Sequence, residues 1–166
     1  MEVRDAITAR RSIRKYKNSQ IPKDILEDLL DAARLAPSSM NRQRWSIVVV
    51  ADDETKRELV PVCGNQKFVA GCSAFLVGVS EPGAYYSAVD MAIALDHLSL
   101  RAVELGLGTC WIGDFEPDKL KKILGIPGER DVPVCMTLGY PAVVPAARKR
   151  KSLSGIYCRN RWGKSW

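Results

Sequence analysis

The stretch "YYSAVDMAIALDHLSLRAVELGLG" occupies residues 85–108 and repeats apolar residues at helical spacing. Such a repeat buries one face of a helix, and Gly106 and Gly108 supply a stop signal. The stretch therefore predicts the longest helix of the chain and a core element, with a buried face made of Ala88, Met91, Ala92, Leu95, Leu98, Ala102 and Leu105. The opposite stripe, expected to be a solvated or interface polar face, holds Asp90, Ala94, His97, Arg101 and Glu104.

Three apolar runs around this helix read as buried strands, because they are continuous, rich in β-branched residues and closed by turn residues. They are "WSIVVVA" at 45–51, "AFLVGVS" at 74–80 and "VPVCMTLGY" at 132–140. Two further helices are expected in "IPKDILEDLLDAARLAP" at 21–37 and "EPDKLKKILGIPG" at 116–128, each bounded by proline or glycine. Since strands and helices mix without a regular βαβ repeat, the pattern favours an α+β fold.

The 166 residues carry 25 Lys and Arg against 19 Asp and Glu, a formal net charge of +6 that favours anionic partners. The five cysteines are odd in number, widely spaced and without a Cys-x-x-Cys pair, so no disulfide framework and no metal site is indicated. No apolar run approaches the roughly 18 residues of a membrane span, and the N-terminus has no apolar leader. We therefore expect one compact cytoplasmic domain.

The segment "RRSIRKYK" at residues 10–17 concentrates positive charge. If it is extended, alternation sends Arg10, Ser12 and Arg14 to one side and the intervening residues to the other. Two guanidinium groups and a hydroxyl on one edge suit a phosphate or a planar heterocycle with carbonyl acceptors. A solvated basic segment explains the same spacing equally well, and "RKRK" at 148–151 alone indicates a charged tail or a nucleic-acid patch.

Hydrolytic chemistry finds little support in the sequence. His97 is the only histidine, and no Gly-x-Ser-x-Gly turn accompanies it. The glycines of "GLGTCWIG" at 106–113 suit a loop whose backbone approaches a ligand, but they follow a helix instead of opening one, unlike a dinucleotide fingerprint. Any demanding chemistry is therefore expected to belong to a cofactor.

Six pieces of the chain, taken in order, resemble the FMN-dependent nitroreductase family. They are "RRSIRKY", "APSSMNRQRW", "GNQKF", "ELGLGTCWIGDF", "LGYP" and "RKRKSL". The resemblance spans essentially the whole chain and implies one nitroreductase-like FMN-binding domain over residues 1–166. It also implies an α+β fold with a central mixed β-sheet flanked by helices, an extended C-terminal arm, and an intertwined homodimer with FMN sites at the subunit interface.

The resemblance assigns the cofactor contacts to residues scattered along the sequence. It places Arg10, Arg11 and Ser12 at the phosphate and ribityl end of FMN, and Arg14 at the N1 and C2 carbonyl edge. It gives Pro37, Ser38, Ser39 and Asn41 to the flavin bound mainly by the other subunit, Asn65 and Gln66 to the polar edge of the ring, Ile112 and Gly113 to the backbone facing N5, and Arg148 and Arg150 to the phosphate.

Three departures from the family pattern affect this assignment. Arg44 stands where relatives usually have proline before the tryptophan. The link "SEPGAYYS" at 80–87 is short where larger relatives insert a helical excursion, which predicts a shallower and more open pocket. Phe68 stands where some relatives place a lysine near the phosphate.

The implied activity is hydride transfer from NAD(P)H through FMN N5 to an electron-poor acceptor, a nitroaromatic or a quinone, by a double-displacement mechanism. No side chain need act as an obligatory acid or base. The alternatives are specialised flavin chemistry of the same family, reductive dehalogenation or flavin fragmentation, and a basic nucleic-acid-binding module. The family reading implies a homodimer and a small-molecule acceptor, with neither nucleic acid nor membrane as partner.

Overall fold

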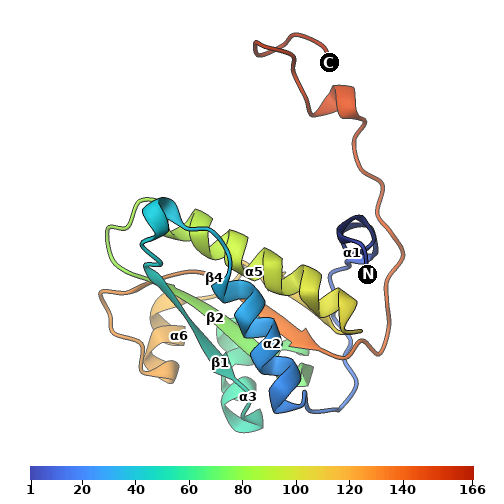
Figure 1. Ribbon diagram of the computed structural model, residues 1–166. Coiled ribbons are helices and arrows are strands. Elements are labelled where there is room, and N and C mark those ends of the chain that lie inside the picture. Colours follow the sequence, from blue (N-terminus) through green and yellow to red (C-terminus); the bar gives the residue numbers. More distant parts are fainter.

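The computed structural model describes residues 1–166 and alternates helices with four strands (Figure 1). The helices are α1 (Val3–Ala9), α2 (Lys23–Arg34), α3 (Asp53–Val62), α4 (Phe68–Gly71), α5 (Ser87–Glu104) and α6 (Pro117–Leu124), with short 3-10 turns η1 (Ser39–Asn41) and η2 (Leu153–Gly155). The strands are β1 (Trp45–Val50), β2 (Ala74–Ser80), β3 (Gly108–Ile112) and β4 (Asp131–Gly139). The α+β class is confirmed.

The four strands form one sheet in the order β1-β2-β4-β3, and every neighbouring pair is antiparallel. The expected mixed sheet is therefore corrected to an antiparallel one. The only parallel pairing is an isolated bridge between Ser12 and Thr109, outside the named strands. All seven residues of β2 are buried. A strand covered on both faces has the continuous apolar composition that parallel strands also have, so composition did not reveal strand direction.

Helices cover both faces of the sheet. On one face α2 and α5 pack with Leu76 and Met136, and on the other α3 and α6 pack with Phe75 and Cys135. Successive residues of a strand point to opposite faces, which explains why Phe75 and Leu76 belong to different cores. Gly78 allows α5 to approach β2 closely, because a Cβ there would lie 2.8 Å from Met91 Cγ.

The predicted helix at 85–108 is confirmed as α5, but its buried face is rotated from the expected one. Asp90 and Ala94, assigned to the polar stripe, are buried, whereas Ala88 and Ala92, assigned to the core, are exposed. The sheet covers one side of α5, and α2 and the η1 loop cover another side. The buried part of the helix surface therefore differs from its most apolar part. Sequence patterning did not predict α1, α3 or β3, and the last was expected to be a loop.

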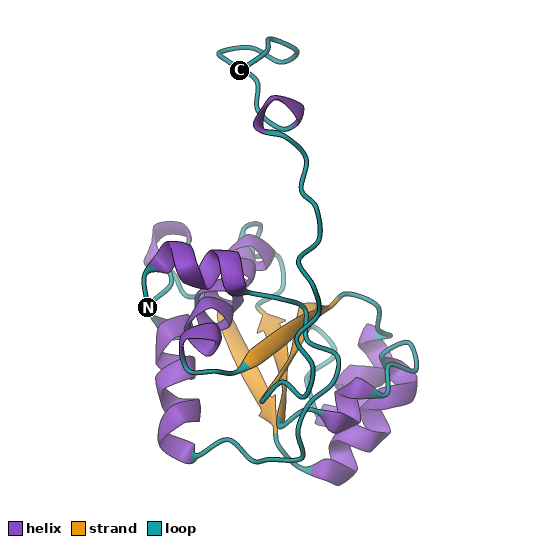
Figure 2. Ribbon diagram, turned by 90° about the vertical axis from the view of Figure 1, so that its right-hand side faces the viewer, coloured by secondary structure: helices purple, strands orange, loops and turns teal.

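Beyond the sheet the chain continues as an extended arm that leaves the body (Figures 1 and 2). Every residue from 142 to 166 is exposed. The last backbone hydrogen bond that joins this arm to the body runs from Ala142 N–H to Lys15 O, 2.9 Å. No helix of the structure combines the length and the apolar character that crossing a bilayer requires.

Candidate functional site

The basic segment at 10–17 is extended, as predicted, and lies against the end of the sheet. Ile13 N–H donates to Thr109 O at 2.9 Å, and Lys17 N–H donates to Tyr140 O at 2.8 Å. Ile13 is 2% exposed and packs on Gly108, where a Cβ would collide with its Cγ1. The absence of a side chain at the start of β3 therefore lets the basic segment lie directly on the strand.

Tyr16 fixes the far end of this segment from inside the protein. Its hydroxyl donates to Ile13 O at 2.8 Å and lies 2.7 Å from Thr137 Oγ1. Burial raises the pKa of the Tyr16 phenol, so the hydroxyl stays protonated and remains a donor. The segment is thus held by both its backbone and its buried side chains.

The basic segment runs beside β3, where Ser12 forms a parallel bridge with Thr109. Burial raises the pKa of the neighbouring Cys110 thiol, and the charges of Arg14 and Arg10 oppose that rise. Both arginines therefore lie near β3, whereas the alternation of Arg10, Ser12 and Arg14 to one side stays a prediction.

Two guanidinium groups of the segment hold buried N–H donors without partners. Arg10 Nη1 and Arg11 Nε are both buried and make no hydrogen bond. Arg11 Nη1, in contrast, donates to Thr8 O at 2.7 Å and to Arg10 O at 2.8 Å. Buried donors are almost always paired in folded proteins, and a cationic donor forms its strongest bonds with anions. The unpaired donors fit the phosphate of FMN.

The segment around Asn65 lies next to the same edge of the sheet. Arg14 Cζ lies 6.0 Å from the centroid of the Phe68 ring, which occupies the family's lysine position. Gln66 Nε2 donates to Cys63 O at 3.0 Å and reaches Asp114 O at 3.4 Å. Asn65 adopts a positive φ of 55° and is exposed. Arg14, Asn65 and Gln66 are thus brought to one region.

Ile112 and Gly113 complete this region at the end of β3. Ile112 is 1% exposed and anchored in the core, whereas Gly113 is exposed. A Cβ at Gly113 would have no heavy atom within 4 Å, so open space lies over its backbone. A flat ring can approach there. The structure therefore brings together Arg10, Arg11, Ser12, Arg14, Asn65, Gln66, Ile112 and Gly113.

The remaining assigned residues lie elsewhere on the chain. Pro37, Ser38, Ser39 and Asn41 form the loop before β1, which begins opposite the last residue of β2. Thr109, beside Ser12, pairs with Leu138, which pairs with the first residue of β2. The start of β1 and the Ser12–Thr109 bridge therefore lie at opposite corners of the sheet, separated by about 20 Å along the strands and about 14 Å across them.

The two tail arginines are not near either group within the same chain. Arg148 and Arg150 lie on the exposed arm, where Arg150 Nη1 contacts Arg148 O at 3.5 Å. One chain by itself does not gather the full set that the resemblance assigns to one cofactor.

The loop at 37–44 has a strained backbone. Met40, Asn41 and Gln43 have φ values of 52°, 54° and 50°. In this left-handed region a side chain such as that of Met40 or Gln43 carries a cost of about 1–2 kcal/mol, whereas Asn adopts it more readily. Such strain persists only where surrounding contacts enforce it, and it is concentrated at functional sites.

Arg44, which replaces the usual proline, is accommodated by the short link that follows β2. Arg44 Nε lies 3.5 Å from Glu81 Oε2, and Glu81 N–H donates to Arg44 O at 3.2 Å. The adjoining Tyr85 and Tyr86 rings meet edge to face with centroids 4.8 Å apart. Together with Met40 they line an open hollow of about 260 Å³, while the shallower substrate pocket expected from the short link stays a prediction.

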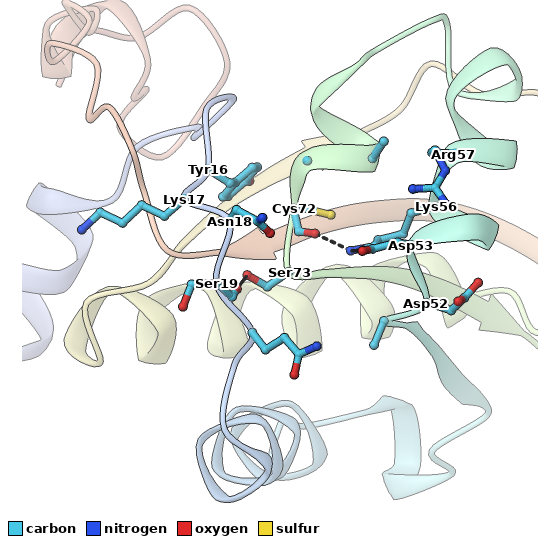
Figure 3. A pocket seen from close by; sticks show the side chains of 14 residues that line it. Tyr16, Lys17, Asn18, Ser19, Asp52, Asp53, Lys56, Arg57, Cys72 and Ser73 are labelled. Carbon is cyan, nitrogen blue, oxygen red and sulfur yellow. Dashed lines mark hydrogen bonds and ion pairs between the residues drawn. The ribbon is translucent and has the colours of Figure 1, made fainter.

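Another pocket, of about 680 Å³, lies away from all the assigned residues (Figure 3). Its wall includes Lys56, whose ammonium donates to Cys72 O at 2.6 Å and pairs with Asp53 at 2.9 Å. The buried charge in this pocket is thus already engaged by the protein. No group of three His, Cys, Asp or Glu side chains is placed to hold a metal ion.

Sequence reasoning missed one buried residue beside the strained loop. Asp90 accepts the Ser39 N–H, although helical periodicity put it on the exposed face of α5. Its position in the first turn of α5 favours a negative charge, but helical spacing gave no signal that this carboxylate is buried.

Comparison with known proteins agrees with this arrangement. The Nitroreductase family model matches residues 7–82 and 64–140. The NADH dehydrogenase of Thermus thermophilus is 31% identical over 180 aligned residues, which cover 86% of this chain and 88% of that protein. An NADPH:FMN oxidoreductase of Vibrio harveyi, solved in complex with NAD+, superposes with a TM-score of 0.91 at 28% identity, covering 98% of this chain and 78% of that one.

A solved FMN-dependent nitroreductase of Clostridium difficile superposes with a TM-score of 0.86 at 29% identity, covering 95% of this chain and 98% of its own. The family match runs from the helix before the basic segment to the end of the last strand. Since it includes both the residues that meet at β3 and the strained loop at the opposite corner, the chain belongs to the nitroreductase family.

Proposed function

We propose that the protein is an FMN-dependent oxidoreductase that uses NAD(P)H to reduce electron-poor acceptors such as nitroaromatics or quinones, with the two substrates occupying the site in turn. The observation that carries the proposal is the pair of buried, unpaired guanidinium donors, Arg10 Nη1 and Arg11 Nε, at the edge of an open region. The family membership and the FMN-dependent relatives support the same cofactor.

The residues that lie together at β3 would each bind a different part of FMN. Arg10, Arg11 and Ser12 hold the phosphate and ribityl end, while Arg14 donates to the carbonyl edge of the ring. A cation at that edge favours the reduced flavin, which carries negative charge there. Bound FMN supplies the redox chemistry, by taking a hydride from NAD(P)H and giving the electrons to the acceptor.

Asn65 and Gln66 carry both donors and acceptors, which matches the mixed polar edge of a flavin. The open space over Gly113 can admit the flavin ring, and donor and acceptor would reach the ring in turn from its other side. No side chain in the region is required as an acid or base, since solvent has access to it.

A second copy of the chain would complete each site. The loop at 37–44 lies at the far corner of the sheet from Ser12, and the arm carrying Arg148 and Arg150 extends away from its own body (Figure 2). A homodimer in which each loop and arm serve the site of the other chain would unite the residues that one chain keeps apart.

The test is to purify the protein, reconstitute it with FMN and measure flavin per chain from the absorption spectrum. We expect a yellow protein with close to one FMN per chain that NADH or NADPH bleaches anaerobically. A protein that binds FAD in preference, or that takes up no flavin, contradicts the proposal. A colourless protein whose nucleic-acid affinity falls steeply with salt would point to the basic binding module instead.

Steady-state kinetics test the order of events. Because donor and acceptor share one open face, double-reciprocal plots at several acceptor concentrations should be parallel. Intersecting lines would show that both substrates bind together and would reject the shared site.

A further inference from the structure

The loop at 38–43 stabilises its unusual shape mainly through bonds to itself. Gln43 N–H donates to Ser38 Oγ at 3.0 Å, and Asn41 N–H donates to Ser38 O at 2.9 Å. Gln43 Nε2 contacts Asn41 O and Asn41 Oδ1, both at 3.2 Å. These bonds fix the curl of the loop, but they do not fix where the loop sits on the protein.

One residue ties this loop to the rest of the fold. Ser39 N–H lies 3.1 Å from each carboxylate oxygen of Asp90, and these are the hydrogen bonds that join residues 38–43 to another element. Asp90 is 7% exposed and takes part in no ion pair. A buried carboxylate needs donors, and here the loop provides one.

The carboxylate itself is held in a fixed position. Asp90 belongs to the first turn of α5, an 18-residue helix whose N-terminal dipole favours a negative charge there. Its neighbour Met91 is fully buried and packs directly over Gly78 of β2. The turn that carries Asp90 therefore cannot shift without disturbing the core, whereas the loop can.

We propose that Asp90 is a positioning residue that holds the left-handed loop where Ser38, Ser39 and Asn41 can contact the FMN bound by the other subunit. The inference rests on the proposed function and adds to it a residue on α5 that touches no flavin itself. Figure 1 shows the loop, in cyan, at the start of α5.

Three variants of the full chain test the proposal through the dissociation constant of FMN, measured by quenching of flavin fluorescence. Asp90→Ala removes the acceptor and should weaken FMN binding at least about tenfold. Asp90→Asn keeps one acceptor oxygen and should restore most of the affinity. Asp96→Ala, on the exposed side of the same helix, is the matched control and should change little. Equal affinity of Asp90→Ala and the parent protein overturns the proposal.

A second set of variants removes the donor instead, and so remains informative if Asp90→Ala folds poorly. Ser38 is extended, with φ −134° and ψ 158°, which is compatible with a following proline. Ser39→Pro eliminates the N–H, while Ser39→Ala retains it and loses only the hydroxyl. We expect Ser39→Pro to bind FMN at least about tenfold more weakly than Ser39→Ala. In an Asp90→Ala background this difference should vanish, since both changes break the same bond. A difference that persists there contradicts the assignment.

Mixed dimers separate positioning from a general loss of structure. One chain carries Arg10→Ala and its partner carries Asp90→Ala, each with its own tag. If the loop serves the opposite site, one site collects both defects and the other keeps intact Arg10 and an intact loop. The mixed dimer should then hold one FMN with the affinity of the parent protein. Two weakened sites would show that Asp90 acts within its own chain and would overturn the proposal.

The same measurements distinguish this inference from the proposed function. If the parent protein binds no FMN, the proposed function fails and the role of Asp90 falls with it. If the parent binds FMN and a mixed dimer of Arg10→Ala with Asn41→Ala keeps one tight site, the shared site stands. Failure of the Asp90 mixed dimer alone then rejects only the role of Asp90.

Discussion

At the level of single residues, cysteine serves in this protein mainly as a small buried side chain. Four of the five thiols are buried, and only Cys158 is exposed. Burial raises the pKa of the Cys63 thiol from 9.0 to about 12, and the nearby Asp114 carboxylate adds to the rise. A thiol that keeps its proton in the folded state but loses it in the unfolded state makes stability depend on alkaline pH.

The sign of that dependence is definite. Above about pH 9 the unfolded chain releases the Cys63 proton while the folded protein retains it up to about pH 12, so stability falls as pH rises across this window. Cys63→Ala should therefore flatten the decline in unfolding free energy by about 1.4 kcal/mol per pH unit. Urea unfolding between pH 9 and 11 measures the slope. Cys158→Ala is the control, and a slope that Cys63→Ala leaves unchanged would refute the assignment.

Lys56 is the other unusual buried residue, since only 3% of it is exposed. Its ammonium donates to the Cys72 carbonyl, and Lys56→Met would leave that buried oxygen unpaired. We expect a loss of about 1.5–3 kcal/mol in unfolding free energy. Lys122→Met, at an exposed position of α6, should change it by less than about 0.5 kcal/mol. Similar losses of unfolding free energy in Lys56→Met and Lys122→Met would show that the bond from the Lys56 ammonium to the Cys72 carbonyl does not stabilise the fold.

The contact between the basic segment and β3 is the critical feature at the element scale. Gly108→Ala would drive a methyl group into Ile13 and push the segment off the strand. We expect a destabilisation of about 1–3 kcal/mol, together with weaker FMN binding because Arg10 and Ser12 move. Gly71→Ala, where the added methyl meets nothing within 4 Å, is the control. Thermal unfolding and flavin titration give the two readouts, and unaltered flavin affinity in Gly108→Ala would contradict this role of the contact.

At the scale of the whole molecule, the C-terminal arm, residues 142–166, is a candidate interaction surface. It exposes Leu153, Ile156, Tyr157 and Trp166, and Trp162 is 96% exposed. Exposed apolar groups of this number indicate an interaction surface. The hydrogen bonds of residues 143–166 run only within the arm.

If the arm forms the proposed dimer, removal of residues 146–166 should leave the α+β body folded while abolishing dimerisation and FMN binding. Sedimentation gives the mass, and far-UV circular dichroism reports the fold. A truncated protein that remains dimeric and yellow would place the dimer contact in the body instead of the arm.

Features that depend on neighbouring residues could be predicted from the sequence. Apolar spacing located α2, α5, α6 and three strands, because a helix or strand repeats its side chains over a few positions. The basic segment at 10–17 was correctly expected to be extended. Sequence patterns did not predict β3, because its glycine and its length of five residues are also typical of a loop. They did not predict α3 either, because that helix contains Pro61.

Features that depend on residues far apart in the chain required the folded structure. Strand direction follows from how the connections cross the sheet, so the three apolar runs gave no sign that the sheet is antiparallel. The burial of Asp90 depends on a loop that lies about 50 positions earlier in the chain. The distance between the two groups of assigned cofactor residues, at two corners of the sheet, also came from the fold, because spatial distance across a sheet is set by pairing order and not by position along the chain.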